Sequence, residues 1–588
     1  MHFLTLNMYN YQCKKTTLRA CFLITFLITF FCMSKTTNPD HYVQPLQMFY
    51  RWEQERSGQT LFHQPIKEGK ITFTWKEAAE QIRRMATALQ AMNLPPSSNI
   101  ALVSKNCAHW IMADLAIMMS GHISVPIYPN VNAETIRYVL EHSQSKVLFV
   151  GKLDNWENMK KGLTAGVHCI SFPLYYGETG YESWDSLVQK NEPLSGQVLR
   201  NLDETATIIY TSGTTGKPKG VMHTFGTMSY TANRAFEVID IKNKAQRFFS
   251  YLPLSHIAER MLVEMGCIYT GSEAYFAESL DTFARNLTEA SPTIFLGVPR
   301  IWTKFQTAIL SKMPQKKLNT LLSIPFVSWL VKRKIQRGLG LDKATICLTG
   351  AAPTPASLIL WFRKIGIEIH EAYGMTENCA YSHFNRIGKG RPGSAGQAMP
   401  DVEVRISPVG EVLVRNAAIM TGYYKQPELT AEVIDAEGFL HTGDKGVVSA
   451  DGYLTITGRV KELFKTEKGK YVAPSPIEML LAENPLIEQT CVTGANLPQP
   501  IALAVLSADA QNQERSALQR RLNDTLQSVN ERLDAHEKLR CMVVLQEPWT
   551  VENDKLTPTL KIKRDPIEQQ YSAQYTTWYA KKEPIIWE

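Results

Sequence analysis

Short apolar runs that alternate with amphipathic stretches are the feature that most restricts the folds open to this chain of 588 residues. The stretches between the runs place apolar residues at helical spacing, as residues 75–93 illustrate. Strands that alternate with helices predict an α/β fold with a largely parallel sheet. The predicted strands are Ile100–Val103, Lys146–Val150, Thr207–Tyr210, Thr293–Leu296 and Ala344–Leu348, and the predicted helices include Ala133–His142 and Leu280–Ala290.

The pattern changes after residue 395. Short strands such as Val402–Ile406 are separated there by Gly, Pro and Asp turns, which is typical of a β-rich subdomain. Farther on, a helix over Ser516–Glu537 and a strand over Val543–Leu545 predict a separate, smaller α+β domain. The predicted domains are a large N-terminal domain of stacked αβ layers plus the β-rich subdomain, residues 34–458, and a small C-terminal domain, residues 459–588.

The composition excludes several classes of protein. Hydrophobic residues make up 44% of the chain and charged residues 20%, which is typical of globular proteins and excludes a disordered, collagen-like or polytopic membrane protein. The net charge of +7 is too dilute to indicate a nucleic-acid partner. The ten cysteines show no CxxC or zinc-ribbon spacing, so we expect free thiols, a reducing compartment and a cytoplasmic location.

A basic and then apolar N-terminal segment leaves three interpretations open. Lys14, Lys15 and Arg19 precede the run ACFLITFLITFFCM over residues 20–33. The run is shorter than the roughly 20 residues that a membrane-spanning helix needs, and it lacks the small-residue cleavage site of a secretory signal. Translation that starts at Met33, a retained membrane anchor and a cleaved signal all fit the pattern. Residues 1–33 are therefore treated as a leader and left out of the fold prediction.

A second segment bears on membrane contact. From Lys304 to Arg337 the chain carries eight basic residues and no acidic residue, and the apolar run Leu321–Val331 lies inside this span. Apolar residues beside a basic cluster are typical of proteins that lie on an anionic bilayer. Two interpretations fit the segment: peripheral contact with the inner face of a membrane, or a helical hairpin that packs into the core and leaves its lysines in solvent.

The strongest local signal is a β-branched strand that runs directly into a loop of small and polar residues. The loop over residues 211–220 holds three glycines, four hydroxyl side chains and two lysines. Glycines allow a close approach of the backbone to a ligand, and exposed N–H groups with lysines form a site for anions. The loop therefore predicts binding of a polyphosphate. It is not a Walker A loop, because Pro218 follows Lys217 where that motif needs a hydroxyl.

The segment YTSGTTGKPKG resembles the signature loop of the adenylate-forming (AMP-binding) enzyme superfamily, which includes acyl-CoA synthetases, luciferases and peptide-synthetase adenylation domains. The resemblance extends from residue 45 to residue 575, through six motifs in the family's order. It implies that ATP is bound by the loop residues Thr211, Ser212, Gly213, Thr214, Thr215, Gly216 and Lys217.

Two later motifs resemble the rest of the family's nucleotide site. Gly350, Ala351 and Ala352 resemble the small-residue turn on which adenine packs. The segment Glu371, Ala372, Tyr373, Gly374, Met375, Thr376, Glu377 matches the motif YGxTE closely. The resemblance implies that this segment binds ATP. Tyr373 would stack on the adenine ring, and Thr376 would form a hydrogen bond with the α-phosphate. It also implies that Glu377 and Thr211 hold a Mg²⁺ ion, which prefers hard oxygen ligands.

Motifs nearer the C-terminus resemble the parts that complete and move the family's site. The resemblance implies that Asp444 accepts the ribose hydroxyls, that Arg459 contacts ribose or phosphate, and that Lys461 is the hinge of a mobile C-terminal domain. Many members carry a small-Gly-Lys tripeptide where this chain has Thr559-Leu560-Lys561, so Lys561 is the candidate catalytic lysine and Lys563 the alternative. His256 resembles the residue that gates the acyl site.

The implied activity is an AMP-forming acid–thiol ligase that uses ATP, Mg²⁺ and CoA. The segments at residues 125–129, 295–305 and 469–474 resemble the long-chain fatty acyl-CoA synthetases, which implies a fatty acid substrate. An aryl or other carboxylic acid, and a carrier protein as acceptor, remain alternatives. A non-catalytic acyl-adenylate-binding protein is a third class, which loss of Lys561, Glu377 or the loop would favour. The sequence leaves the oligomeric state open.

Overall fold

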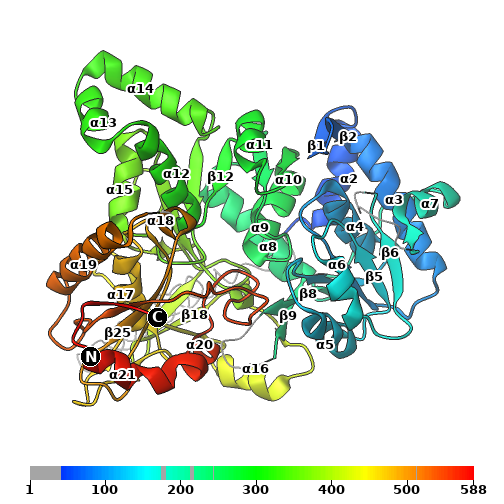
Figure 1. The fold of residues 1–588 in the computed structure, drawn as a ribbon. Coiled ribbons are helices and arrows are strands. Elements are labelled where there is room, and N and C mark those ends of the chain that lie inside the picture. Colours follow the sequence, from blue (N-terminus) through cyan, green and yellow to red (C-terminus); the bar gives the residue numbers. More distant parts are fainter. Residues whose placement is uncertain (1–41, 174–179, 212–216, 243, 512) are drawn as a thin grey trace, which may run out of the picture. The chain divides into compact units, whose positions relative to one another are not determined.

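An eight-stranded sheet contains the first predicted strands (Figure 1). The computed structural model describes residues 42–173, 180–211, 217–242, 244–511 and 513–588, and Val43–Glu588 form one compact unit. Neighbouring strands from β8 to β7 pair in parallel, whereas β9 pairs antiparallel with β8 and with β19. In sheet order the strands are β19 (Gly422–Tyr423), β9 (Lys219–Thr224), β8 (Thr205–Thr211), β4 (Ile123–Ile127), β3 (Asn99–Val103), β5 (Val147–Val150), β6 (His168–Ser171) and β7 (Glu182–Ser183).

A thirteen-stranded sheet has a parallel part and an antiparallel part that meet at β14 (Ile369–Tyr373). The first part is β2 (Lys70–Thr74), β1 (Thr60–Pro65), β11 (Glu273–Phe276), β10 (Arg247–Ser250), β12 (Ile294–Leu296) and β13 (Ile346–Thr349), all parallel except β2. The antiparallel part is β15 (His383–Phe384), β16 (Gly396–Ala398), β21 (Tyr453–Arg459), β20 (Leu440–Val448), β18 (Glu411–Arg415) and β17 (Glu403–Ile406). This second part is the β-rich region predicted after residue 395.

The helix α4 (Ala108–Met119) lies between the two sheets, where it contacts β3 and β4 of one and β1 of the other. All of its residues are buried, including Asp114. A helix that is apolar on every side can only be stable inside a core, so the two sheets bury it from both sides.

The remaining helices lie around the two sheets. The helix α3 (Trp75–Ala91) begins at Thr74, whose hydroxyl accepts from the Glu77 amide while the Glu77 side chain accepts from the Thr74 amide. The others are α2 (Pro45–Glu55), α5 (Ala133–Ser143), α6 (Trp156–Met159), α7 (Trp184–Lys190), α8 (Phe225–Val238), α9 (Ile257–Glu259), α10 (Met265–Thr270), α11 (Phe283–Ala290), α12 (Pro299–Lys312), α13 (Gln315–Leu322), α14 (Pro325–Gly338), α15 (Ala356–Lys364) and α16 (Pro427–Val433).

A separate four-stranded sheet lies near the C-terminus, with helices on both faces. Its second strand, β25 (Ile501–Leu506), is buried at every position, because alternate side chains enter two different cores. One core contains residues of α17 (Pro474–Leu481) and α19 (Arg515–Glu531), and the other contains residues of α20 (Arg564–Tyr571) and α21 (Tyr575–Ala580). The remaining elements are β22 (Phe464–Lys465), β23 (Tyr471–Val472), β24 (Ile487–Thr493), α18 (Ala508–Gln511), β26 (Met542–Val544) and β27 (Ile585–Trp587).

The predicted α/β architecture is confirmed, and two predicted helices differ at their ends. The helix predicted from Leu280 begins at Phe283, after a turn in which the Ser279 and Thr282 side chains cap each other's amides. The helix predicted to Glu537 ends at Glu531, because the side chain of Asn530 hydrogen-bonds both backbone groups of Leu539 and turns the chain.

Three further predictions concern cysteines and membranes. All seven cysteines in the described ranges are free and buried, as expected for thiols that act as small apolar residues. Within the part of the chain that the structure describes, no helix is both long and apolar enough to cross a bilayer. The leader, residues 1–33, lies outside the described residues.

Candidate active site

The glycine-rich loop joins β8 to β9, two strands that form an antiparallel hairpin in which Thr211 pairs with Lys219. Ser212, Gly213, Thr214, Thr215 and Gly216 lie outside the described residues. Lys217 is exposed, and its ammonium lies 5.5 Å from the ring centroid of Tyr138. The ammonium of Lys219 lies 5.3 Å from the ring centroid of Tyr423. Both lysines therefore stand over aromatic faces at the base of the loop.

The segment that contains Thr376 and Glu377 lies directly beside this hairpin. The Nε2–H of His223, on β9, donates a hydrogen bond of 2.7 Å to the carbonyl oxygen of Thr376. The strand β19 pairs with β9, and its Tyr423 hydroxyl donates a bond of 2.9 Å to Oε1 of Glu377. Two segments more than 150 positions apart in the sequence are thus joined through one strand.

Glu377 has the surroundings that a metal carboxylate needs. The residue is only 9% exposed. The backbone amide of Met420 holds it in place by donating a hydrogen bond of 2.8 Å to the Glu377 carbonyl oxygen. Burial, and then the adjacent Glu377 carboxylate, raise the pKa of Tyr423, so its phenol remains a donor. Oε1 receives that phenol, and Oε2 has no hydrogen-bond partner among the described residues. This oxygen, with the Thr211 hydroxyl at the end of β8, is the donor set that suits Mg²⁺.

No group of three His, Cys, Asp or Glu side chains that could hold a metal by themselves occurs in the described ranges. Mg²⁺ usually keeps several waters and binds one or two protein oxygens together with substrate phosphates. A site with one carboxylate and one hydroxyl fits that pattern.

The small-residue turn after β13 packs against the strand β14. A side chain at Gly350 would place its Cβ 2.8 Å from the carbonyl oxygen of Ala372, so only glycine allows this approach. Gly374 is constrained in the same way by the backbone of Ala380. Ala351 and Ala352 are exposed, which leaves the surface beside β14 lined by small side chains.

Glu371 differs from Glu377 although the same motif contains both. Its Oε2 accepts hydrogen bonds from the Asn385 side chain, at 3.1 Å, and from the Gly393 amide, at 3.0 Å. Burial raises the pKa of Glu371 to about 8, so the group is largely protonated at neutral pH. The structure thus ties Glu371 to the segment between β15 and β16 rather than to the hairpin of the loop.

Tyr373, Asp444 and Arg459 form one hydrogen-bonded group. The Tyr373 hydroxyl donates a bond of 2.7 Å to Oδ2 of Asp444, and Nε of Arg459 lies 3.0 Å from Oδ1. Asp444 and Arg459 face each other across the paired strands β20 and β21. Asp444 is buried, and burial followed by the Asp444 charge raises the pKa of Tyr373. The three residues predicted to surround the nucleoside are therefore brought together.

Lys561 is held on a tight turn. The Thr557 amide donates to the Lys561 carbonyl oxygen at 2.8 Å, and the Lys561 amide donates to the Thr557 hydroxyl at 3.1 Å. Leu560 has a φ of +61°, the left-handed region that favours glycine. The resemblance puts Leu560 at the position where many family members have glycine, and a φ in this region strains a leucine. Arg564, three residues on, is bound by both carboxylate oxygens of Glu478 at 2.7 Å.

The structure separates Lys561 from Lys563. The Lys563 ammonium pairs with Asp554 on the surface of the turn. The Lys561 ammonium instead lies within electrostatic reach of Arg459, Asp444 and Glu377. Protein packed around it lowers its pKa, Arg459 lowers the pKa further, and the carboxylates act in the opposite direction. Lys561 nevertheless retains an exposed surface, so solvent reaches the residue.

His256 is oriented by the helix that follows it. Its Nδ1 accepts a hydrogen bond of 3.2 Å from the Ala258 amide at the start of α9, so Nε2 carries the proton of the neutral ring. Burial, and then the nearby Lys561 charge, lower the pKa of His256 to about 4. The residue is therefore neutral at physiological pH, and it lies near enough to Lys561 to feel its charge.

Two residues that sequence reasoning missed contact the predicted ones. Tyr423, bonded to Glu377, lies 46 positions from it in the sequence. Asn130, just after β4, donates a bond of 3.0 Å from its side chain to the carbonyl oxygen of Pro558. The second contact holds the turn of Lys561 against the large sheet region. Lys461, the predicted hinge, is exposed in the segment between β21 and β22.

A cluster of buried charges beside the site was also missed. Arg260 begins a π-helical turn, Arg260–Glu264, directly after α9, and it has no exposed surface. Its guanidinium lies 2.5 Å from Asp114, 3.2 Å from Glu264 and 2.6 Å from the hydroxyl of Thr207. Burial and the adjacent Asp114 raise the pKa of Glu264 far above its ordinary value. The cluster ties the turn after α9 to α4 and to the strand β8 that leads into the glycine-rich loop.

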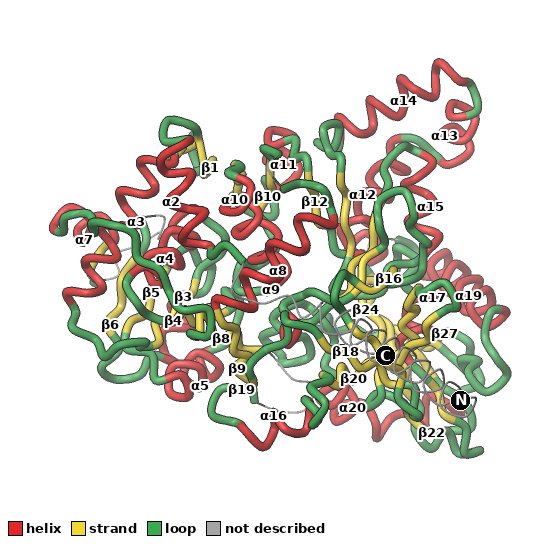
Figure 2. The backbone as a smooth tube through the Cα atoms, turned by 180° about the vertical axis from the view of Figure 1, so that it is seen from behind, coloured by secondary structure: helices red, strands yellow, loops and turns green. Residues whose placement is uncertain are grey.

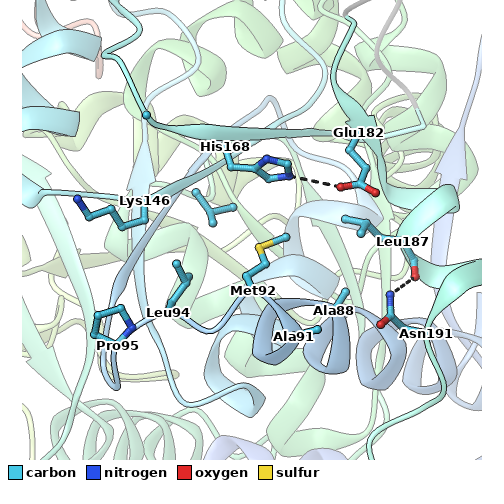
Figure 3. A pocket seen from close by; sticks show the side chains of 12 residues that line it. Ala88, Ala91, Met92, Leu94, Pro95, Lys146, His168, Glu182, Leu187 and Asn191 are labelled. Carbon is cyan, nitrogen blue, oxygen red and sulfur yellow. Dashed lines mark hydrogen bonds and ion pairs between the residues drawn. The ribbon is translucent and has the colours of Figure 1, made fainter.

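A surface cavity of about 620 Å³ lies elsewhere, at the C-terminal end of α3 and the edges of β5 and β6 (Figure 3). Its lining includes Met92, Leu94 and Lys146, and none of the predicted site residues. His168 and Glu182 in its wall pair with each other at 3.4 Å, as the dashed line in Figure 3 shows. This cavity is not part of the site described above.

Comparison with protein families gives two matches. The model described as AMP-binding enzyme matches residues 49–424, and the model described as AMP-binding enzyme C-terminal domain matches residues 462–583. The long-chain-fatty-acid-CoA ligase FadD15 of Mycobacterium tuberculosis is 28% identical, over 91% of this chain and 97% of that protein. The long-chain-fatty-acid-CoA ligase ACSBG2 of Rattus norvegicus is 28% identical, over 87% and 90%.

Solved structures share the fold. The anthranilate CoA ligase AuaEII in complex with anthranoyl-AMP superposes with a TM-score of 0.75 at 21% identity, over 91% of this chain and 98% of that one. The adenylation domain of a carboxylate reductase from Mycobacterium chelonae superposes with a TM-score of 0.78 at 21% identity, over 92% and 91%. The predicted family resemblance is confirmed.

Proposed function

The chain belongs to the AMP-binding enzyme family, and we propose that it is an ATP-dependent ligase that joins a fatty acid to CoA and releases AMP and pyrophosphate. One observation carries the proposal. Arg459, Asp444 and Glu377 all lie within electrostatic reach of Lys561, and Glu377 lies beside the hairpin of the glycine-rich loop.

We assign the site residues as follows. ATP phosphates bind the glycine-rich loop from Thr211 to Lys217, and adenine lies against the small residues after β13 and against Tyr373. Asp444 and Arg459 bind the ribose, because a buried carboxylate beside a guanidinium suits a diol next to a phosphate. Residues 34–458 form the large domain of this proposal, and residues 459–588 form the small domain that turns about Lys461.

The first step is the attack of a fatty acid carboxylate oxygen on the α-phosphorus of ATP. A P–O bond to the acid forms, the bond to the bridging oxygen breaks, and pyrophosphate leaves with its electron pair. Both reactants are anionic, so positive charge must offset their repulsion in the transition state. Lys561 and Arg459 supply that charge from one side, and Lys217 and Lys219 do so from the loop. Mg²⁺ held by Glu377 and Thr211 would add Lewis-acid stabilisation of the phosphates.

The second step is attack by the CoA thiol on the acyl carbon, after which AMP leaves. The turn of Lys561 contacts the large domain through Asn130 and Pro558. Rotation about Lys461 breaks that contact, removes Lys561 and opens the acyl carbon to the thiol. His256 stands at the acyl side of the site, and its neutral ring moves without the desolvation that a charged ring would need.

The similar proteins and the surface of this protein both support a fatty acid as the substrate. Both ligases compared above are named for long-chain fatty acids, and they match nearly the full length of this chain. The exposed basic and apolar helical segment after α12 supports peripheral contact with a membrane, where such acids partition. A cytoplasmic enzyme that reaches the inner face of a membrane fits both points.

An acid panel tests the proposal. The full-length protein is incubated with ATP, MgCl₂ and CoA, and with saturated fatty acids of rising chain length, benzoate or anthranilate, while AMP and pyrophosphate are measured. We expect equimolar AMP and pyrophosphate, with the highest kcat/KM for a medium or long fatty acid. Preference for an aromatic acid would change the substrate class from a fatty acid to an aryl acid. Adenylate formation that stalls with CoA but proceeds with a phosphopantetheinylated carrier protein would change the acceptor. ATP binding without any turnover would leave a non-catalytic binder.

A further inference from the structure

The helical hairpin α13–α14 stands away from the sheets, at the upper left of Figure 1 and the upper right of Figure 2. The bend between the two helices lies farthest out, and α12 connects the hairpin to β12. The core-packing interpretation of this segment is wrong for the outer half of α14. Phe326 is 73% exposed and Trp329 is 52% exposed, with Ile324 and Leu330 each at 47%.

The helix α14 has two faces, and only one packs on the protein. Val331, Ile335 and Leu339, spaced four residues apart, lie partly buried against the core around Trp302 and Phe362. Phe326, Trp329 and Arg333 lie on the opposite face, three and four residues apart. The rings of Phe326 and Trp329 stack with centroids 6.4 Å apart, and the Arg333 guanidinium lies 5.3 Å from the Trp329 ring.

The outer face of α14 changes from apolar to basic along the helix axis. The first turns are apolar, and the last turns hold Lys332, Arg333, Lys334 and Arg337. No acidic residue occurs from Pro299 to Leu341. Among the described residues only Arg337 of these four forms an ion pair, with Asp342 at 3.9 Å. The positive charges of the other three are therefore available to an outside partner.

We propose that the tip of the α13–α14 hairpin inserts into the headgroup region of an anionic lipid bilayer. An exposed aromatic and aliphatic tip with a tryptophan suits the boundary between headgroups and acyl chains. Basic residues one or two turns behind it complement the anionic surface. A purely polyanionic partner, such as a nucleic acid, would match the lysines but would leave Phe326, Trp329 and Leu330 in water. A lipid surface satisfies both halves of the helix.

The position of the hairpin links the membrane to the reaction, a link that rests on the proposed function. The helix α12 runs from Pro299 to Lys312, about 21 Å at 1.5 Å per residue. Two residues separate its start from the end of β12, whose neighbour β13 ends at the small-residue turn of Gly350. The helices α12 and α13 therefore connect the tip, where a fatty acid would leave the bilayer, to the carboxyl ends of these strands.

Flotation with vesicles tests the docking without any turnover. The full-length protein is mixed with vesicles of phosphatidylcholine alone or of equal parts phosphatidylcholine and phosphatidylglycerol. The charge variant is Lys317→Glu/Arg333→Glu/Lys334→Glu, and the control variant Lys538→Glu/Lys581→Glu/Lys582→Glu changes the net charge equally at other exposed lysines. At about fivefold for each charge near the surface, the loss of three charges should weaken binding of the first variant to anionic vesicles at least about 100-fold, and the control should bind as the parent does.

Fluorescence locates the tip itself. The signal of Trp329 is the difference between the parent protein and Trp329→Phe. We expect brominated lipid to quench this signal on anionic vesicles, and acrylamide to quench it in the absence of lipid. Protection from acrylamide without lipid would mean that another part of the chain covers the tip, and this would overturn the proposal. Equal vesicle binding by the parent and the charge variant, or binding to RNA but not to vesicles, would also overturn it.

Turnover separates this proposal from the proposed function. Thermal denaturation first shows that the variants are folded. With a water-soluble short-chain acid, the charge variant should keep the kcat/KM of the parent, whereas with palmitate supplied in anionic vesicles its rate should fall at least tenfold. Absent turnover with intact vesicle binding would refute the ligase assignment alone. Equal rates with vesicle-borne palmitate would refute the role of the hairpin alone.

Discussion

The molecule contains two groups of charged side chains next to each other. The two groups differ in solvent exposure and in how completely their charges are paired. Around Arg260 every charged side chain is without exposed surface, and the cation contacts both carboxylates directly. Around Lys561 the charges come from four different segments, and among the residues that the structure describes only Asp444 and Arg459 of these four pair directly with each other. The first group is closed and can serve only the fold. The second group leaves charge available, which is what a polyanionic substrate requires.

The difference also appears in proton binding. Two carboxylates share one guanidinium around Arg260, and burial followed by the charge of Asp114 raises the pKa of Glu264, which favours its protonated form. Around Lys561 the packed protein and then the nearby Arg459 lower the pKa of the lysine, and the carboxylates of Asp444 and Glu377 act in the opposite direction. The charges of the closed cluster compensate one another, whereas the charges of the open site remain available to a ligand.

Replacement of Arg260 should have the largest effect, and on stability. Arg260→Met leaves Asp114 and Glu264 buried without a cation, and breaking a buried pair in this way costs about 3–5 kcal/mol. The loss should be smaller at pH 5 than at pH 8. A carboxyl whose pKa is raised by folding stabilises the protein in its protonated form, and that stabilisation is lost as the pH rises above the ordinary value near 4.5. Urea denaturation at both pH values measures it.

A surface pair provides the control for that experiment. Arg532 binds Glu483 at 2.7 Å, but 49% of the Arg532 side chain is exposed. Arg532→Met should cost less than about 1 kcal/mol and should show no particular pH dependence. If Arg260→Met proved as mild as Arg532→Met, the closed cluster would not be the structural element described above.

Replacement of Lys561 should affect the first half-reaction only. Lys561→Ala removes a charge from the open group without leaving a buried partner unpaired, so we expect an unchanged melting temperature. Adenylation should fall about 10²–10³-fold, as when one transition-state donor is removed. Thiolysis of supplied acyl-adenylate should continue at the parent rate. Lys563→Ala is the matched control, because Lys563 pairs with Asp554 on the surface and should change neither rate much. Equal loss of both half-reactions in Lys561→Ala would contradict the assigned role.

The two glutamates of one motif sharpen the comparison further. Glu377→Gln should lower the rate of adenylation about 10²-fold and raise the Mg²⁺ concentration that gives half the maximal rate. Glu371→Gln should leave the Mg²⁺ dependence unchanged, because Glu371 is already bonded to Asn385 and Gly393 and largely protonated at neutral pH. A titration of MgCl₂ at saturating ATP measures both. A parallel shift in the two variants would show that the motif acts as a whole and not through one metal carboxylate.

The sequence predicted those elements of the fold that local sequence patterns determine. The strands at residues 100–103 and 207–210, and the helix at residues 133–142, differ from the structure by no more than two residues at either end. Such elements are set by the local alternation of apolar residues and by capping residues. The resemblance also implies that Glu377 and Lys561 share one site, and in the structure Glu377 lies within electrostatic reach of Lys561.

The contacts that the sequence could not predict depend on pairing between distant segments. Tyr423 reaches Glu377 only because β19 pairs with β9, and no local pattern around residue 423 signals that pairing. Arg260 and Asp114 are 146 positions apart, and a charged residue destined for the core looks the same in a sequence as one destined for solvent. The periodicity of α14 likewise shows two faces but not which of them meets the protein.

The smallest effect should come from Leu560, which separates the shape of the lysine turn from its charge. Leu560 adopts a φ of +61° and is 56% exposed, so Leu560→Gly removes backbone strain and little packing. We expect a gain below about 1 kcal/mol, because relief of the left-handed strain is partly offset by the greater freedom of glycine in the unfolded chain. Leu199→Gly, at an exposed leucine of ordinary φ, should instead destabilise the protein slightly. Adenylation should stay within twofold of the parent rate in both variants. If Leu560→Gly lost stability as Leu199→Gly does, the turn would not hold Lys561 in the strained conformation, and the equivalence of Thr559-Leu560-Lys561 with the family's small-Gly-Lys tripeptide would fail.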